Sequence, residues 1–137
     1  EDVKRSIFLS TSGVVGCSSS APLVLPNDDS EFCTQTVGGW PYYFSKIEME
    51  RRVRGLALSS RCPVVFLRPS MILGPGDQRL RSSQTVISFL QQRIPVVPGG
   101  GVSFVDVRDV AKAVIKTIEA PTREVAFKGF LLGSANW

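Results

Sequence analysis

The hydrophobic positions of the chain include short unbroken runs as well as longer periodic segments. Two runs lie at residues 6–10 and 63–67, where large apolar side chains follow one another directly. Runs of this length are typical of strands that are covered on both faces, as in a parallel sheet. The pattern also predicts a short extended segment at residues 102–107 and a last strand at residues 127–132.

The segments between these runs have helical character. They cover residues 41–58, 83–93 and 109–120, and the last of them has the apolar spacing of an amphipathic helix. Pro41 suits a first helical turn. Residues 17–39 have no sustained periodicity, which predicts a long loop. Loops of this length often have a function. This alternation predicts an α/β fold with a parallel sheet, whose sites lie beyond the carboxyl ends of the strands.

The first helical segment carries a phenol and an ammonium on one face. Tyr42 and Lys46 are four residues apart, which places them about 40° from each other around a helix. A cation held near a phenol favours the phenolate, so the pair suits proton transfer near neutral pH. Tyr43 is the poorer candidate, because the residue at the same spacing from it is Ile47. The face of Tyr42 continues through apolar residues and is expected to pack against the protein: Met49, Val53 and Leu56.

Composition limits the classes of function. The 137 residues are 43% hydrophobic and 20% charged, which is enough for one globular domain at most. No apolar run approaches the roughly 20 residues of a membrane span, and the first residues do not form a signal peptide. The net charge is +4, and the basic group Arg51, Arg52 and Arg54 fits a solvated helix face better than a nucleic-acid interface. We therefore expect a soluble protein of the cytoplasm or an organelle.

Cysteine and histidine usage narrows the chemistry further. Cys17, Cys33 and Cys62 are odd in number and form no CxxC pair, so a disulfide framework is not expected and a reducing compartment fits better. The chain contains no histidine. Within this chain, that excludes Ser-His-Asp catalysis, Cys-His catalysis and His-ligated zinc, and we predict no metal site. Any acid–base catalysis by this chain must therefore use Tyr, Lys, Asp, Glu or Ser.

Polar and glycine residues gather in four short motifs. IFLSTSG (7–13) ends the first predicted strand, and Tyr42-x-x-Ser45-Lys46 opens the first helix. LRPS (67–70) leads to GPGD (74–77), and FVDVRDVA spans 104–111. In this order, the motifs resemble the serine strand, the Tyr-x-x-x-Lys helix, the next strand and loop, and the substrate-side segment of the extended short-chain dehydrogenase/reductase family. That family contains dihydroflavonol-reductase-like and hydroxysteroid-dehydrogenase-like enzymes and nucleotide-sugar epimerases.

The resemblance implies the carboxyl-side part of a Rossmann-like doubly wound parallel sheet, with part of a small substrate-binding region. The sheet part would cover about residues 5–75 and the substrate side about residues 76–137. The family's Gly-x-x-Gly-x-x-Gly loop, which holds the pyrophosphate, has no counterpart here, since no helix is predicted after Gly99-Gly100-Gly101. We therefore expect the chain to be the carboxyl half of a longer protein.

The resemblance also assigns catalytic roles. Tyr42 would exchange the proton with the substrate oxygen, and Lys46 would favour its phenolate and hydrogen-bond the nicotinamide ribose. Ser12 would hydrogen-bond the substrate oxygen, because aligning the strand hydrophobics selects it. Counting back from Gly16 selects Thr11 instead, and both remain candidates.

A nicotinamide dinucleotide, NAD or NADP with NADP favoured, is the implied cofactor. Its expected contacts are Ser10, Thr11, Tyr42, Lys46, Pro69, Ser70 and Met71. For Ser10, a backbone-bonded strand end is the preferred interpretation. For residues 69–71, a plain strand-to-loop transition is an equal alternative.

Other polar and apolar residues are expected to be structural. Arg68 and Arg108 are assigned to structure, and Asp109 is predicted to be a helix N-cap rather than a catalytic acid. The residues predicted to lie in the core are Met49, Val86, Phe89 and Val114.

The expected function is hydride transfer between a nicotinamide and a small-molecule carbonyl or alcohol. Nucleotide-sugar enzymes tend to have an Asn where this chain has Met71, and a thioether cannot replace the paired donor and acceptor of an amide. This favours an apolar or phenolic carbonyl, or a sterol-like alcohol. The alternatives are a nucleotide-sugar epimerase or dehydratase of the same fold and a non-catalytic dinucleotide-binding protein. No nucleic-acid partner and no transmembrane segment are expected, and a homodimer is compatible with the sequence.

Overall fold

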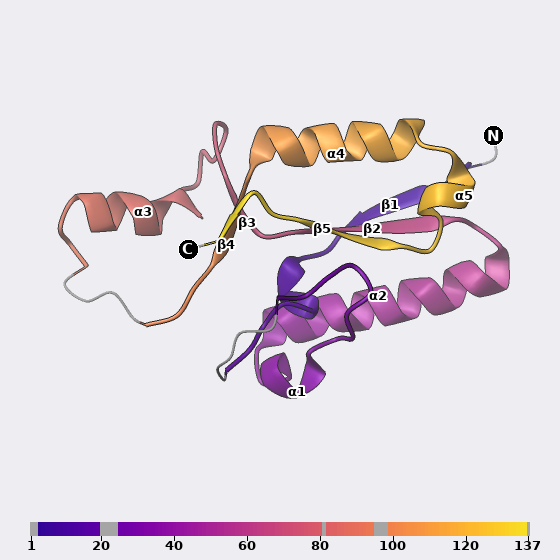
Figure 1. Cartoon of the computed structure of the whole chain (residues 1–137), viewed down its shortest axis with the longest axis horizontal. Helices are drawn as coiled ribbons and strands as arrows, with labels where there is room; N and C mark the ends of the chain where they lie inside the picture. The colour runs from indigo at the N-terminus through magenta and orange to yellow at the C-terminus, as the bar shows by residue number, and fades with distance from the viewer. Residues whose placement is uncertain (1–2, 20–24, 81, 95–98, 137) are drawn as a thin grey trace.

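The chain folds into α/β layers around a short parallel sheet (Figure 1). The computed structural model describes residues 3–19, 25–80, 82–94 and 99–136. The expected loop at residues 17–39 lies partly outside these ranges.

Three strands form the main sheet. β1 (Ser6–Leu9) and β5 (Gly129–Leu132) both pair in parallel with the central strand β2 (Val64–Pro69). Leu9 pairs with Leu67 across the first ladder, so β1 and β2 end at the same edge of the sheet. The strands predicted at the apolar runs 6–10 and 63–67 and at residues 127–132 are confirmed.

Helices cover both faces of this sheet. α2 (Pro41–Ser60) lies on one side and α4 (Val107–Glu119) on the other, as Figure 1 shows. Alternate residues of β2 face the two helices, because successive side chains of a strand point to opposite faces. Val64 and Phe66 belong to the cluster with α2, and Val65 and Leu67 belong to the cluster on the α4 side. The predicted α/β fold with a sheet buried on both faces is confirmed.

A second, smaller sheet continues from the end of β2. β3 (Met71–Leu73) pairs in parallel with β4 (Ser103–Asp106), and β6 (Ala135–Asn136) pairs with β4 in the antiparallel direction. Only Ser70 separates β2 from β3. The alternative of a plain strand-to-loop transition after β2 is therefore wrong, since the chain passes from one sheet into the next.

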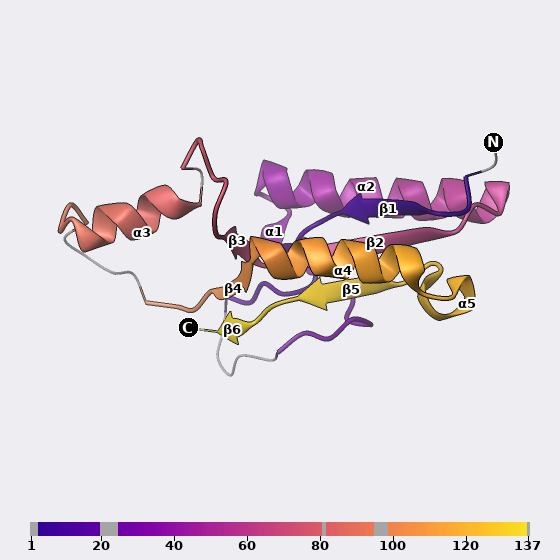
Figure 2. The same ribbon diagram turned by 90° about the horizontal axis from the view of Figure 1, so that it is seen from above.

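α3 (Ser83–Leu90) stands apart from the layered body in both views (Figures 1 and 2). The prediction that Val86 and Phe89 are core residues is wrong, because they are 40% and 53% exposed. Their apolar spacing is real, but no other element covers that face within the described residues. Met49 and Val114, in contrast, pack against the two core clusters as predicted.

Short elements and one helix cap also differ from expectation. η1 (Ser12–Val14), α1 (Thr34–Val37) and α5 (Thr122–Val125) are too short to produce a periodic pattern. The N-cap of α4 is Asp106, whose carboxylate accepts from the Arg108 amide at 2.7 Å. The prediction that Asp109 is the cap is wrong: it lies in the first turn and pairs with Lys112.

No helix in the described ranges is both long enough and apolar enough to cross a membrane.

One edge of the main sheet is apolar and open. Within the described residues, β1 pairs only with β2, and a shallow hollow beside it is lined by Lys4, Arg5, Ile7, Val114 and Ile118. Leu9 at the end of the strand is exposed. An apolar edge with unpaired backbone groups is a template for pairing with another chain.

We therefore expect residues 1–137, expressed alone, to self-associate rather than remain monomeric. Light scattering should show an average mass above that of the 14.9 kDa chain, rising with concentration. Replacing the exposed Leu9 with Lys would place a charge at this edge and should reduce association. A monodisperse monomer at all concentrations would contradict this prediction.

Candidate active site

Two serine hydroxyls lie buried at the carboxyl edge of the main sheet. Ser10 follows β1 and is 5% exposed, and Ser70 follows β2 and is 8% exposed. Their backbone amides extend the ladders, donating to the Leu67 and Leu132 carbonyl oxygens at 2.8 and 2.9 Å. Neither side-chain oxygen has a hydrogen-bond partner in the described part of the chain. An unpaired buried hydroxyl costs about 1–3 kcal/mol, so both oxygens are suited to a partner from outside the chain.

The loop after β1 carries the two candidate catalytic hydroxyls. Thr11 has extended backbone and caps η1, with its hydroxyl oxygen accepting from the Gly13 amide at 3.4 Å. Ser12 is the first residue of η1, and its side chain has no hydrogen bond within the described ranges, whereas its carbonyl accepts from the Gly16 amide at 2.8 Å. The Thr11 hydroxyl is thus partly engaged in a cap and that of Ser12 is available.

The amino end of α2 docks on this loop through Tyr43. A Cβ atom on Gly13 would lie 2.1 Å from Tyr43 Cε1, so the ring occupies the space that only a glycine leaves. Tyr43 is partly buried, and burial raises the pKa of its phenol. Trp40 lies against its ring at 5.6 Å between centroids, and Tyr42 meets it edge-on at 5.3 Å.

Tyr42 itself is 57% exposed at this end of the helix. The prediction that its face packs against the protein is confirmed for Met49 and Val53, which pack against the core cluster between α2 and β2. It is wrong for Leu56, which is 71% exposed. The fully buried residues of α2 lie on the neighbouring stripe Tyr43, Ile47, Glu50, Arg54 and Ala57. Sequence reasoning missed this stripe because two of its members are charged.

Lys46 joins the helix to the end of β1. Its Nζ donates to the Leu9 carbonyl oxygen at 3.0 Å. Among the described residues, no hydrogen bond links Lys46 to Tyr42, and none links Tyr42 to Ser12. The structure therefore brings Lys46 to the strand end and Tyr43 to the Ser12 loop, and leaves the Tyr42 ring partly open to solvent.

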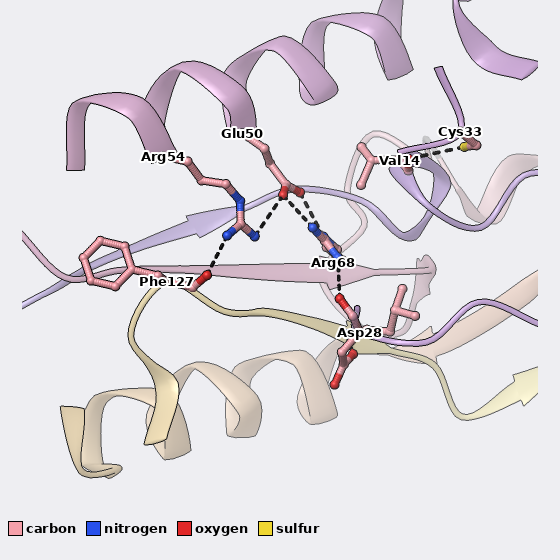
Figure 3. Close-up of polar contacts among 8 residues, drawn as sticks. Val14, Asp28, Cys33, Glu50, Arg54, Arg68 and Phe127 are labelled. Atoms are coloured by element: carbon pink, nitrogen blue, oxygen red, sulfur yellow. Dashed lines mark hydrogen bonds and ion pairs between the residues drawn. The ribbon is translucent and has the colours of Figure 1, made fainter. Parts of the chain in front are cut away.

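Glu50 and Arg68 form a buried ion pair beneath this region (Figure 3). Glu50 is 0% exposed and accepts from Arg68 Nε at 3.1 Å and from an Arg68 terminal nitrogen at 2.8 Å. Arg68 also donates to the Asp28 carbonyl at 3.1 Å. Arg54 lies 3.8 Å from Glu50, and burial lowers the pKa of this guanidinium. Arg68 is thus structural, as predicted, and its partner Glu50 was not anticipated.

Of the remaining predicted contacts, Pro69 is buried at the end of β2 and pairs with Leu132. Met71 begins β3 and is partly exposed. Arg108 is structural as predicted: it pairs with the Asp106 carboxylate and holds the pKa of that group well below its usual range.

Substitution of Gly13 tests how α2 is docked. Gly13→Ala should lower the free energy of unfolding by about 1–3 kcal/mol, because the new methyl group overlaps the Tyr43 ring. Denaturant unfolding of the full-length protein measures this. Gly55→Ala is the matched control, since a methyl group there meets no atom within 4 Å. In a Tyr43→Ala background, Gly13→Ala should lower the free energy of unfolding much less, because the ring that the methyl group overlaps is gone. If the effects of the two substitutions on the free energy of unfolding are additive, the docking contact is contradicted.

Comparison with known proteins places this arrangement in a family. The family model for the NAD dependent epimerase/dehydratase family matches residues 1–133. The chain belongs to this family. Its members include the extended short-chain dehydrogenases/reductases that the four motifs resemble, so that predicted resemblance is confirmed. No curated protein matches the chain.

Solved structures of this family share the fold. A yeast methylglyoxal/isovaleraldehyde reductase complexed with NADPH has a TM-score of 0.76 and 19% identity, over 98% of this chain and 44% of its own. A nucleoside-diphosphate-sugar epimerase from Pseudomonas aeruginosa has a TM-score of 0.81 and 16% identity. The match covers 98% of this chain and 43% of the epimerase chain.

A UDP-glucose 4-epimerase from Thermus thermophilus in complex with NAD has a TM-score of 0.70 and 20% identity, over 97% and 44% of the two chains. The present chain thus spans less than half the length of these three family members. At these identities the likeness establishes the Rossmann-like fold.

Proposed function

We propose that this family member is the catalytic carboxyl-side part of an NAD(P)-dependent oxidoreductase acting on a carbonyl or alcohol. The observation that carries the proposal is the amino end of α2, where the exposed Tyr42 stands one turn before Lys46, and Lys46 is anchored on the last residue of β1. This position is the carboxyl edge of a parallel sheet, where α/β proteins bind their ligands.

The chain supplies the groups that handle the proton. In reduction, the Tyr42 hydroxyl donates a proton to the substrate oxygen, and in oxidation the phenolate accepts it. The Ser12 hydroxyl donates a hydrogen bond to the same oxygen and stabilises the negative charge that develops there. Ser12 is favoured over Thr11 because the Thr11 oxygen already caps η1. When bound, the nicotinamide supplies or accepts the hydride.

The buried edge of the sheet fits the nicotinamide end of a dinucleotide. Ser10 and Ser70 present two hydroxyls that lack a partner within the described residues, and Pro69 and Met71 flank Ser70. Lys46 would hydrogen-bond the ribose, and Thr11 would complete the contacts. Of the two dinucleotides, we favour NADP.

The pyrophosphate end would be held elsewhere. Gly99, Gly100 and Gly101 lead into β4 rather than into a helix, so they do not form a phosphate-binding loop with a helix terminus. We propose that a segment outside residues 1–137 holds this end of the cofactor, in keeping with the greater length of the three solved family members.

The rival function is nucleotide-sugar epimerisation or dehydration on the same fold. Met71 favours reduction over this rival, because its side chain cannot make the paired hydrogen bonds of an amide. A non-catalytic dinucleotide-binding protein is the second rival. The pairing of an exposed Tyr42 with an anchored Lys46 favours catalysis over binding alone, since binding a dinucleotide does not require a phenol at this place.

Nicotinamide turnover distinguishes the three functions. The full-length protein should oxidise NADPH or NADH stoichiometrically with ketones or aldehydes from an apolar and phenolic panel, and should leave UDP-sugars unchanged. Interconversion of UDP-sugars without net nicotinamide oxidation would favour epimerisation. Dinucleotide binding without turnover of either substrate class would favour a binding protein. Either result would contradict the proposed function.

Lys46→Met tests the role of the ammonium. We expect NADPH affinity to fall about tenfold or more, because a hydrogen bond from a charged donor contributes about 1.5–3 kcal/mol. Turnover should fall as well. Lys112→Met is the matched control, since Lys112 lies exposed on α4 and pairs with Asp109. Calorimetric titration with NADPH measures the affinity, and a wild-type value for Lys46→Met would remove Lys46 from the cofactor site.

A further inference from the structure

Two serine hydroxyls approach Gly133, where the main sheet meets the second sheet. Ser70 joins β2 to β3, and Ser103 is the first residue of β4. A Cβ atom on Gly133 would lie 2.8 Å from Ser103 Oγ and 3.8 Å from Ser70 Oγ. The second sheet begins where β2 and β5 end, as Figures 1 and 2 show. These three residues therefore form a small polar cradle at the carboxyl edge of the main sheet.

The fold itself uses neither hydroxyl of the cradle. Ser70 is 8% exposed, and its oxygen has no hydrogen-bond partner among residues 3–19, 25–80, 82–94 and 99–136. Ser103 is partly buried, and its hydroxyl forms no hydrogen bond with another described residue. The neighbouring Ser134 differs, because its hydroxyl donates to the Phe104 carbonyl at 3.1 Å. A buried hydroxyl without a partner is costly, so the cradle is suited to a ligand that supplies one.

Gly133 leaves the space in which the two hydroxyls meet. The described glycines with positive φ are Gly74, Gly76 and Gly100, so the backbone at Gly133 does not itself require a glycine. The close approach of the Ser103 hydroxyl is what excludes a larger side chain there. Gly133 is also exposed, so a ligand can reach the cradle from solvent.

We propose that the Ser70 and Ser103 hydroxyls bind the carboxamide group of the nicotinamide beside the bare backbone of Gly133. This inference deepens the proposed function and rests on it, since it requires a nicotinamide dinucleotide as the cofactor. A carboxamide has an acceptor oxygen next to an NH2 donor, and a serine hydroxyl can both donate and accept. Two hydroxyls therefore match both ends of the amide: one donates to its oxygen and the other accepts from its NH2 group.

The position and the charge of the cradle favour the carboxamide over other ligand groups. Lys46, which is proposed to bind the ribose, reaches the last residue of β1, and Ser70 follows the adjacent strand β2. The ring that is attached to this ribose would thus lie near Ser70. Neither serine hydroxyl carries a charge, so the cradle suits a neutral amide better than a phosphate, which is bound most strongly by charged donors.

The affinity for nicotinamide analogues tests the cradle without relying on turnover. The full-length protein would be titrated by calorimetry with NADP+ or NAD+, whichever binds more tightly. It would also be titrated with the acetylpyridine analogue of that dinucleotide, in which a methyl group replaces the amide NH2. Ser70→Ala and Ser103→Ala should each weaken binding of the carboxamide form about three- to tenfold, the effect of one hydrogen bond. In the double variant, the preference for the carboxamide form over the analogue should fall by a similar factor, because the group that accepts from the NH2 is gone.

Two further variants separate the cradle from its surroundings. Gly133→Ala keeps both hydroxyls but places a methyl group 2.8 Å from Ser103 Oγ, so it should weaken binding about as much as Ser103→Ala. Ser134→Ala is the matched control, since the Ser134 hydroxyl already donates to a backbone carbonyl, and it should bind both dinucleotides like the wild type. Without cofactor, Ser70→Ala should keep or raise the unfolding temperature, because its hydroxyl has no partner within the described residues to lose.

Unchanged affinity for the carboxamide form in both single variants would overturn the inference, as would an equal loss for the two forms in the double variant. A rise in KM for the carbonyl alone would assign the cradle to the substrate and overturn it too. A lower unfolding temperature of Ser70→Ala with wild-type affinity would mean that the hydroxyl is structural. If the predicted affinities are found but no carbonyl is turned over, the proposed function fails and the cradle stands. Failure to bind any nicotinamide dinucleotide would overturn both.

Discussion

Replacing Tyr42 with phenylalanine should lower turnover by about 10²–10⁴-fold, the contribution expected of a positioned proton donor. Affinity for NADPH should stay close to the wild-type value, because the ring, its exposure and the Lys46 anchor on Leu9 are retained. Steady-state rates with the best carbonyl substrate give the first quantity, and fluorescence titration with NADPH gives the second.

Tyr43→Phe is the matched control for this substitution. The Tyr43 ring packs on Gly13, and the ring is kept when only the hydroxyl is removed. We therefore expect turnover close to wild type. Unchanged turnover in Tyr42→Phe would refute its role, and a large loss confined to Tyr43→Phe would show that the neighbouring phenol is the acid.

Replacing Glu50 with alanine should lower the free energy of unfolding by about 3–5 kcal/mol. The reason is that Arg68, which is only 3% exposed, would keep its charge and lose both hydrogen bonds to the carboxylate. The same change would loosen α2 from β2, since the pair joins these two elements. Urea unfolding of the full-length protein measures the loss.

Glu48→Ala is the matched control on the same helix. Glu48 pairs with Arg51 and Arg52 on the exposed side, where ion pairs contribute about 0–1 kcal/mol. Replacing both Glu50 and Arg68 with Met should cost far less than Glu50→Ala, because no uncompensated charge remains. A cost for Glu50→Ala no larger than that for Glu48→Ala would contradict the account of the buried pair.

The sequence was most informative where hydrophobic runs and spacing coincide with burial. The unbroken run of β2 correctly indicated a strand covered on both faces, and Pro41 correctly indicated the amino end of α2. The orientation of α2 was not predictable from apolar residues, because its buried stripe includes Glu50 and Arg54. Both charges have partners from other parts of the chain. Glu50 pairs with Arg68 of β2, and the Phe127 carbonyl accepts a hydrogen bond from Arg54.

The other incorrect predictions from the sequence also have local structural causes. Asp106 and Asp109 both precede apolar helical residues, and only the backbone turn decides which one caps α4. The apolar positions of α3 have the pattern of a core-facing helix, yet the helix lies away from the sheet.

The most direct test of the proposed function is the fate of the transferred hydride. The full-length protein would be incubated with a ketone substrate and NADPH in which both hydrogens of the reactive nicotinamide carbon are replaced by deuterium. The account predicts one deuterium at the carbinol carbon of the alcohol product for each NADPH oxidised, and transfer that is slowed about 10²–10⁴-fold in Tyr42→Phe. Loss of deuterium to solvent, or UDP-sugar epimerisation with no net oxidation of NADPH, would contradict it.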